Sequence, residues 1–107
     1  MELPQVQHPR TDRVPVVRPV SYEVLTRLEG AERHNGEAMT GKAMLLNISQ
    51  GGMLLLMTHR MLVDVPLLVD HTAFHDVVQV HGLSEVVWTC PLFLAPQLHF
   101  VGVQFLR

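Results

Sequence analysis

The chain has 107 residues, of which 48% are hydrophobic and 17% are charged. A length of about 100 to 150 residues is typical of one domain, and this hydrophobic share favours a folded core over disorder. Eight Lys and Arg against ten Asp and Glu give a formal charge of −2, which argues against a general polyanion binder. Any anionic ligand must therefore be held by a local cluster of basic groups.

Cysteine usage and hydropathy indicate the compartment. Cys90 is the single cysteine, so an intramolecular disulfide is excluded and a reducing compartment is favoured. The N-terminus lacks the basic stretch and apolar run of a signal peptide, and no apolar segment reaches the roughly 18 residues of a membrane helix. We expect a cytoplasmic domain that does not insert into a membrane.

Residues 1–14 are polar, contain Pro4 and Pro9, and have no hydrophobic period. They predict a flexible arm before a domain that spans residues 15–107. From Val20 the apolar residues alternate with polar ones, which predicts a first strand that begins near Pro19.

The middle of the chain predicts a hairpin after a long connection. Residues 29–41 carry three glycines and mixed charges without an apolar face, which is typical of a solvated connection. Two apolar runs, residues 42–48 and 52–57, follow with only Ser49-Gln50-Gly51 between them. This spacing predicts two neighbouring antiparallel strands joined by a tight turn.

Three further strands are predicted in the second half, over residues 66–69, 77–89 and 100–106, with a bend at Gly82 in the second of them. No amphipathic helix pattern extends beyond two turns. Six short strands must pair or close their edges to avoid aggregation, so the sequence predicts an all-β fold, a six-stranded antiparallel barrel.

The hexamer Asn47-Ile48-Ser49-Gln50-Gly51-Gly52 resembles the signature of the PilZ domain family, which is Asp or Asn, any residue, Ser, two residues and Gly. The resemblance continues through Glu85-Val86-Val87-Trp88 and Val101-Gly102-Val103-Gln104-Phe105-Leu106, and covers most of residues 10–107. It implies a PilZ-type β-barrel that binds the bacterial second messenger cyclic di-GMP. The family usually ends in a helix after the last strand, whereas this sequence stops at Arg107; a trimmed chain, a homodimer and a domain of a longer protein all stay open.

A second family motif places two arginines four residues apart in the arm. Arg13 with the following Val14-Pro15-Val16 resembles the second arginine, whereas Pro9 stands at the first position and Arg10 follows it. A guanidinium can donate two parallel hydrogen bonds to guanine O6 and N7 and can stack on a purine. Arg18, close to the first strand, is either a further basic group of the arm or a solvated charge.

The resemblance implies a ligand site for cyclic di-GMP made of Arg10, Arg13, Asn47, Ser49 and Gly52. The two arginines would clamp guanine and phosphate. Asn47 and Ser49 would pair with a base edge or hold the turn, and Gly52 would let the ligand approach the backbone. Trp88 is expected at the barrel rim, where it could also contact a ligand or a partner.

Other chemistry is not expected. His71 and His75, beside Asp70 and Asp76, form the densest cluster of metal-ligating residue types, but histidines four apart point together only on a helix. Cys90 has no histidine at a recognisable spacing, so it is not expected to be a nucleophile. The sequence therefore predicts no enzyme, no bound metal and no cofactor. A barrel for nucleic acid polymers would need a basic groove with exposed aromatics, which the pattern does not supply.

Two functions therefore remain. The first is a cyclic di-GMP receptor whose arm orders on the ligand and changes the surface shown to an effector protein. The second is a degenerate PilZ domain that binds no nucleotide and serves as a protein-interaction adaptor of the motility or pilus type. The proline at position 9 is the main support for the second.

Overall fold

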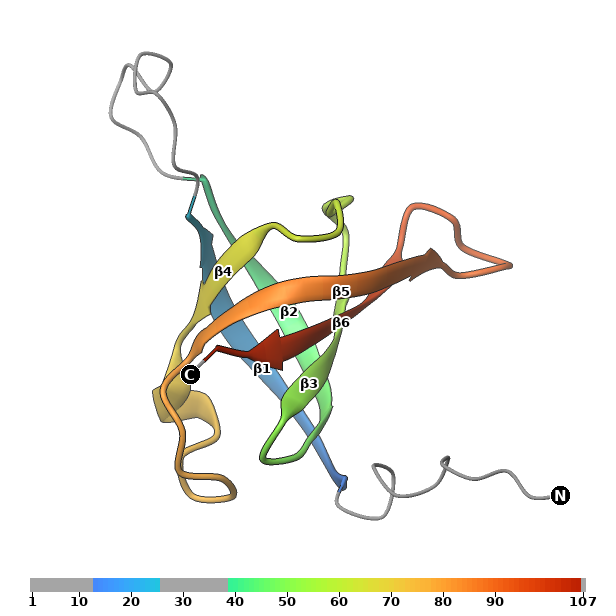
Figure 1. Ribbon diagram of the computed structural model, residues 1–107. Coiled ribbons are helices and arrows are strands. Elements are labelled where there is room, and N and C mark those ends of the chain that lie inside the picture. Colours follow the sequence, from blue (N-terminus) through green and yellow to red (C-terminus); the bar gives the residue numbers. More distant parts are fainter. Residues whose placement is uncertain (1–12, 26–38, 107) are drawn as a thin grey trace, which may run out of the picture.

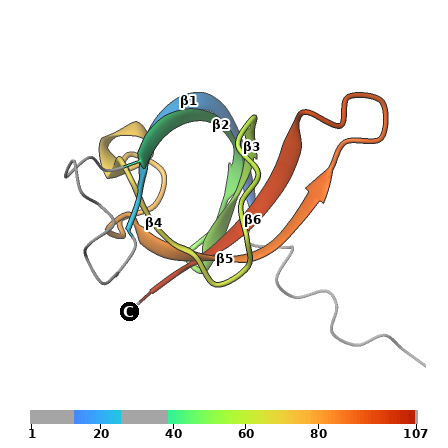
Figure 2. The same ribbon diagram turned by 90° about the horizontal axis from the view of Figure 1, so that it is seen from above.

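The computed structural model describes residues 13–25 and 39–106. Six antiparallel strands close into one barrel in the order β1-β2-β3-β6-β5-β4 (Figures 1 and 2). Apart from one short 3-10 turn, the described residues contain no helix. The predicted all-β, six-stranded barrel is confirmed. The elements are β1 (Val14–Val24), β2 (Met39–Ile48), β3 (Gly52–Met57), β4 (Pro66–Val69), η3 (His71–Ala73), β5 (Leu83–Pro91) and β6 (His99–Phe105).

The barrel closes around alternate apolar side chains from every strand. Leu45, Leu55, Leu67, Val86 and Val101 are completely buried, one from each of β2 to β6. Burying a Leu or Val side chain contributes about 1.5 to 3 kcal/mol each. Because side chains alternate in a strand, the residues between them face outward and are free to build a site.

The predicted β2–β3 hairpin is present. The Ser49 amide donates to the Gly52 carbonyl at 2.9 Å, which closes the turn. The turn is also held to the last strand, since the Phe105 amide donates to the Gly51 carbonyl at 2.8 Å. The loop is therefore fixed against the barrel at both ends.

β1 begins at Val14, so the predicted start near Pro19 was wrong. Its early part pairs with β2 alone, because β4 pairs only with Tyr22–Val24. Proline lacks an amide hydrogen and is confined to edges or bulges within sheets. Pro15 and Pro19 thus lie in a stretch of β1 that has one strand neighbour, with a register shift after Pro15.

The strand predicted over residues 77–89 was also wrong in its first half, since β5 begins at Leu83. Val77 and Val78 instead belong to a compact turn, in which both their amides donate to the Phe74 carbonyl. Phe74 is fully buried and Val78 is 6% exposed. Burying these two side chains in the hydrophobic core overrides the strand preference of the valines.

Other predictions fall on residues that the structure does not describe. Residues 1–12, with Arg10 and most of the predicted arm, lie outside the described residues. The same holds for residues 29–38 of the predicted connection. Its last three residues, 39–41, were wrongly assigned, since β2 begins at Met39 and not at residue 42, and these three residues pair with the end of β1.

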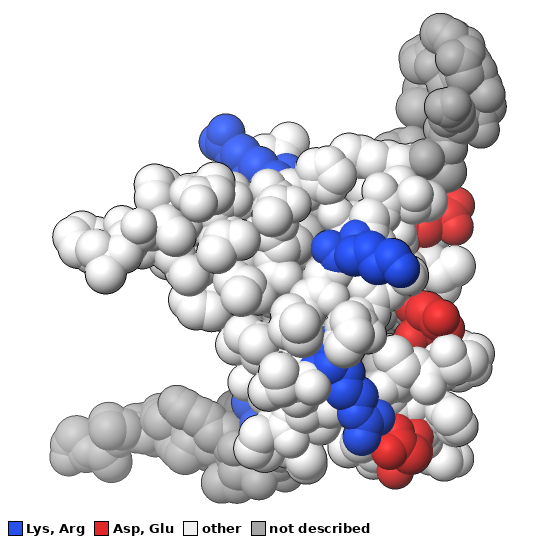
Figure 3. All heavy atoms as spheres, turned by 180° about the vertical axis from the view of Figure 1, so that it is seen from behind, with Lys and Arg blue, Asp and Glu red and all other residues white. Residues whose placement is uncertain are grey.

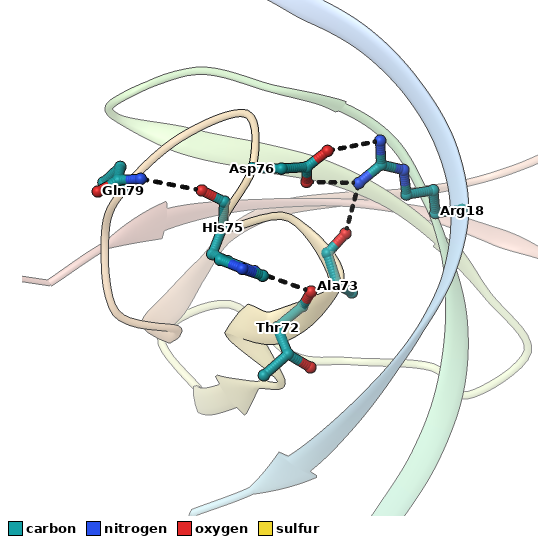
Figure 4. Close-up of polar contacts among 6 residues, drawn as sticks. All are labelled: Arg18, Thr72, Ala73, His75, Asp76 and Gln79. Atoms are coloured by element: carbon teal, nitrogen blue, oxygen red, sulfur yellow. Dashed lines mark hydrogen bonds and ion pairs between the residues drawn. The ribbon is translucent and has the colours of Figure 1, made fainter.

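Arg18 holds the turn segment after η3 against β1. Its guanidinium donates to both carboxylate oxygens of Asp76, at 2.7 and 3.1 Å, and to the Ala73 carbonyl at 3.0 Å (Figure 4). The hydrogen bond from Arg18 lowers the pKa of Asp76, and the same bond raises the pKa of Arg18. Arg18 is therefore a structural ion-pair partner on the flank of the barrel.

Replacing Arg18 by glutamine is expected to lower the free energy of unfolding at neutral pH by a small amount, since the paired side chains are 40% and 56% exposed. The folded-state pKa of Asp76 lies below its ordinary 3.8. The ion pair thus stabilises the fold above pH 3.8 and its contribution is lost as the pH falls through the lower folded value. Urea unfolding as a function of pH checks this, with the exposed Arg60→Gln as control; a difference from wild type that does not shrink in acid would contradict it.

Candidate ligand-binding site

A hollow of about 550 Å³ lies where the start of β1, the β2–β3 turn, β5 and β6 meet. It brings together four of the five residues predicted for the ligand site, and the fifth, Arg10, lies outside the described residues. Residues from β5 and β6 complete it. Its polar and small lining residues, with the one aromatic, are Arg13, Asn47, Ser49, Gly51, Gly52, Trp88, Gly102 and Gln104.

Arg13 reaches the hollow because of the β1–β2 register. Val14 lies opposite Ile48 and Pro15 opposite Asn47, so the residue before β1 stands next to the β2–β3 turn. Its Nη1 donates to Asn47 Oδ1 at 2.7 Å across 34 positions of sequence. The arginine predicted in the arm and the asparagine predicted in the turn are thus in direct contact.

Ser49 organises the floor of the hollow. Its Oγ accepts hydrogen bonds from the Gly51 amide at 3.1 Å and the Gly52 amide at 3.3 Å. A hydroxyl has two acceptor lone pairs and one donor hydrogen. Its oxygen accepts from the turn, and among residues 13–25 and 39–106 no acceptor takes its hydroxyl hydrogen, which can therefore be donated to a ligand.

The two glycines of the turn differ in what surrounds them. A Cβ added at Gly52 would overlap the carbonyl oxygen of Val103 and crowd the Gln104 Cα. A Cβ added at Gly51 would meet only the Ser49 hydroxyl, at 3.9 Å. Position 52 therefore requires glycine because the β6 backbone lies against it. The open space where a ligand could approach the backbone lies at Gly51 instead.

Trp88 forms one wall. It lies opposite Gly102 in the β5–β6 ladder, just after a register shift, and is 45% exposed. A Cβ at Gly102 would overlap the indole ring, so the ring lies directly against the β6 backbone. Sequence reasoning left Trp88 open between ligand and partner contact and did not find Gly102 or Gln104. The sequence showed an aromatic residue and a glycine on two predicted strands. It did not show that they lie opposite each other, because this pairing depends on the register shift between Val86 and Trp88.

Arg13, Asn47 and Ser49 offer hydrogen-bond donors to the hollow. In the part of the chain that the structure describes, the Asn47 amide hydrogens, the Ser49 hydroxyl hydrogen and further N–H groups of Arg13 have no acceptor. Arg13 is the one charged residue among the described lining residues. An acceptor-rich, anionic ligand fits this arrangement.

A second hollow, of about 600 Å³, lies over β1, β2 and β4. It is slightly larger, but its charged lining residues are Glu23, Lys42 and Asp70. Two carboxylates against one ammonium disfavour an anion. For an anionic ligand we therefore prefer the hollow at Arg13, which contains no carboxylate among its described lining residues.

The histidine cluster of the sequence is only loosely assembled. The rings of His71 and His75 have centroids 6.4 Å apart. Within residues 13–25 and 39–106, no three His, Cys, Asp or Glu side chains are grouped so that they could hold a metal ion. The same ranges contain no helix long and apolar enough to cross a bilayer.

No protein-family model matches the chain, and neither does any curated protein or solved structure. The strand order establishes the closed barrel, and the Arg13–Asn47 hydrogen bond shows only that these two predicted residues are in contact.

Proposed function

We propose that this barrel is a PilZ-type domain that binds cyclic di-GMP in the hollow at Arg13. The observation that carries the proposal is the contact between Arg13 and Asn47 above the Ser49 turn. It joins the arginine before the first strand to the Asn-x-Ser-x-x-Gly turn, which are the two sequence features on which the resemblance rests.

The chemistry of the hollow suits a guanine nucleotide. Guanine offers O6 and N7 as acceptors on one edge, which a guanidinium meets with two hydrogen bonds. Charge-assisted bonds from arginine to phosphate are about twice as strong as neutral ones. Asn47 and Ser49 supply further donors for acceptor atoms of the base or the phosphate.

Trp88 provides an apolar surface for the base. Its indole is partly exposed while it lies against Gly102. Stacking of a base on an aromatic side chain contributes about 1 to 3 kcal/mol. A purine between the indole and the guanidinium would use both sides of its ring, since guanidinium groups also stack on aromatic planes.

Trp88→Leu is expected to weaken cyclic di-GMP binding by about 5- to 100-fold, because the stacking surface is lost. Trp88 is the single tryptophan, so the intrinsic fluorescence of the wild type is expected to change saturably during the titration. Calorimetry measures the affinity of the variant, with Phe93→Leu as a control that removes an exposed aromatic outside the hollow. Equal binding by Trp88→Leu and wild type would remove Trp88 from the site.

The second candidate is an adaptor that binds no nucleotide, and Pro9 at the position of the first arginine favours it. This adaptor function requires that cyclic di-GMP does not bind to the protein. The absence of any fluorescence or heat change at high ligand concentration would favour this adaptor over the receptor.

A further inference from the structure

The end of β5 and the start of β6 form a hairpin whose tip projects beyond the barrel, here called the β5–β6 arm, residues 87–100 (Figure 2). Its tip is built by hydrogen bonds from the Leu92 amide to the Leu98 carbonyl and from the Leu98 amide to the Ala95 carbonyl. Phe93 is 91% exposed and Leu94 is 88% exposed at this tip. Two large adjacent apolar side chains in water at the end of a projection are typical of a binding surface.

The arm carries no charge. From Val86 to Leu106 the sequence contains no Asp, Glu, Lys or Arg. In the space-filling view the arm is the projection without blue or red atoms (Figure 3). Charged side chains, lysine above all, are a common protection of strand edges against pairing. The arm lacks this protection.

One edge of the arm is also open. β6 is paired on both sides, with β3 through His99–Gln104 and with β5. β5 pairs with β4 only through Leu83–Glu85. The Val86 carbonyl then accepts a hydrogen bond from the Asp64 amide, and the Val86 amide donates to the Val65 carbonyl. Among the described residues, no strand lies along the second side of Val87–Pro91. Peptide groups on such an edge form a template for another strand.

These features together select the kind of partner. A bilayer would accept Phe93 and Leu94, but it offers no hydrogen bonds to peptide groups, and the arm has no Lys or Arg for anionic headgroups. A β-strand with apolar side chains would form hydrogen bonds with the open edge and would cover the apolar side chains of the tip. Pro91 has no amide hydrogen and limits the pairing to the residues before it.

We propose that the partner is a second copy of this chain, with the β5 edges of the two copies paired antiparallel across a two-fold axis. Such an axis makes one edge complementary to itself, so a single surface serves both copies. Because the arm is neutral, the two surfaces meet without repulsion between like charges.

The antiparallel arrangement also gives the tip a place to pack. Each tip points toward the base of the other copy's β5, where the turn before β4 lies against Val86. Leu62 and Val63 of that turn are 66% and 53% exposed. Phe93 and Leu94 of one copy would cover them. The interface does not depend on nucleotide binding, although Trp88 of the hollow lies on the same strand.

Sedimentation equilibrium of the full chain over a wide range of concentration tests the proposal. We expect a monomer–dimer equilibrium that Phe93→Lys weakens at least about 100-fold, because the side chain is lost twice in a symmetric dimer. Val17→Lys is the matched control: Val17 is 71% exposed on β1, away from the arm. Its dimer constant is expected to equal that of the wild type.

Hydrogen exchange tests the strand pairing itself. Amides of Val87–Cys90 on the open edge are expected to exchange more slowly as the protein concentration rises, and to lose this protection in Phe93→Lys. A monomer at every concentration would overturn the proposal, as would a dimer that Phe93→Lys leaves intact. Monomers that sediment with lipid vesicles through Phe93 would also overturn it and identify a bilayer as the partner.

Discussion

Arg13→Ala is expected to weaken cyclic di-GMP binding by about 5- to 100-fold, which is the cost of losing one bidentate arginine contact to guanine. The same change frees Asn47, whose Oδ1 accepts the hydrogen bond from Arg13 in the structure. Calorimetric titration of the variant beside the wild type measures the difference. The fold should be unaffected, because Arg13 is exposed and precedes β1.

Arg60→Ala is the control for the Arg13 experiment. It removes the same charge from an exposed position between β3 and β4, outside the described lining of the hollow. A loss of affinity caused only by net charge would be similar in the two variants. Equal affinity of Arg13→Ala and wild type would contradict the role given to Arg13.

Gly52→Ala is expected to lower the free energy of unfolding by about 2 kcal/mol or more, because forcing an extra methyl group into a well-packed site has a cost of this size. The obstacle is the backbone of Val103, which cannot rotate away as a side chain can. Urea unfolding followed by circular dichroism measures the loss.

Gly51→Ala separates packing from ligand binding. Its methyl would enter open space at the edge of the hollow, so the barrel should keep nearly its full stability while ligand affinity falls. If Gly51→Ala destabilised the barrel as much as Gly52→Ala, the different surroundings of the two glycines would not explain their effects.

Local patterns predicted the fold where local forces decide it. The Ser49-Gln50-Gly51 spacer between two apolar runs was sufficient for the β2–β3 hairpin, because a tight turn and its flanking strands are determined by adjacent residues. The number of strands followed from the same kind of pattern. Barrel closure then followed from the need to pair strand edges.

Two errors have tertiary causes. Val77 and Val78 are good strand formers, yet they lie in a turn that buries Phe74 and Val78 in the hydrophobic core. β1 extends back to Val14 because β2 is long enough to pair with it, through a register shift that no local pattern shows. Both outcomes depend on partners distant in sequence.

The candidate site was predictable in its residues and less so in their roles. The resemblance named Arg13, Asn47, Ser49 and Gly52, which line one hollow. The constraint on Gly52 comes from β6, and the wall formed by Trp88 on Gly102 depends on the β5 bulge. Neither could be inferred without the register of the barrel. Arg10 lies outside the described residues, so its role stays a prediction.

Calorimetric titration of cyclic di-GMP into the full chain, with GTP as control and circular dichroism to verify the fold, tests the central claim most directly. The proposed site predicts saturable heat with cyclic di-GMP and much weaker binding of GTP. A folded barrel that gives no heat at high micromolar cyclic di-GMP would contradict the receptor function and favour the adaptor.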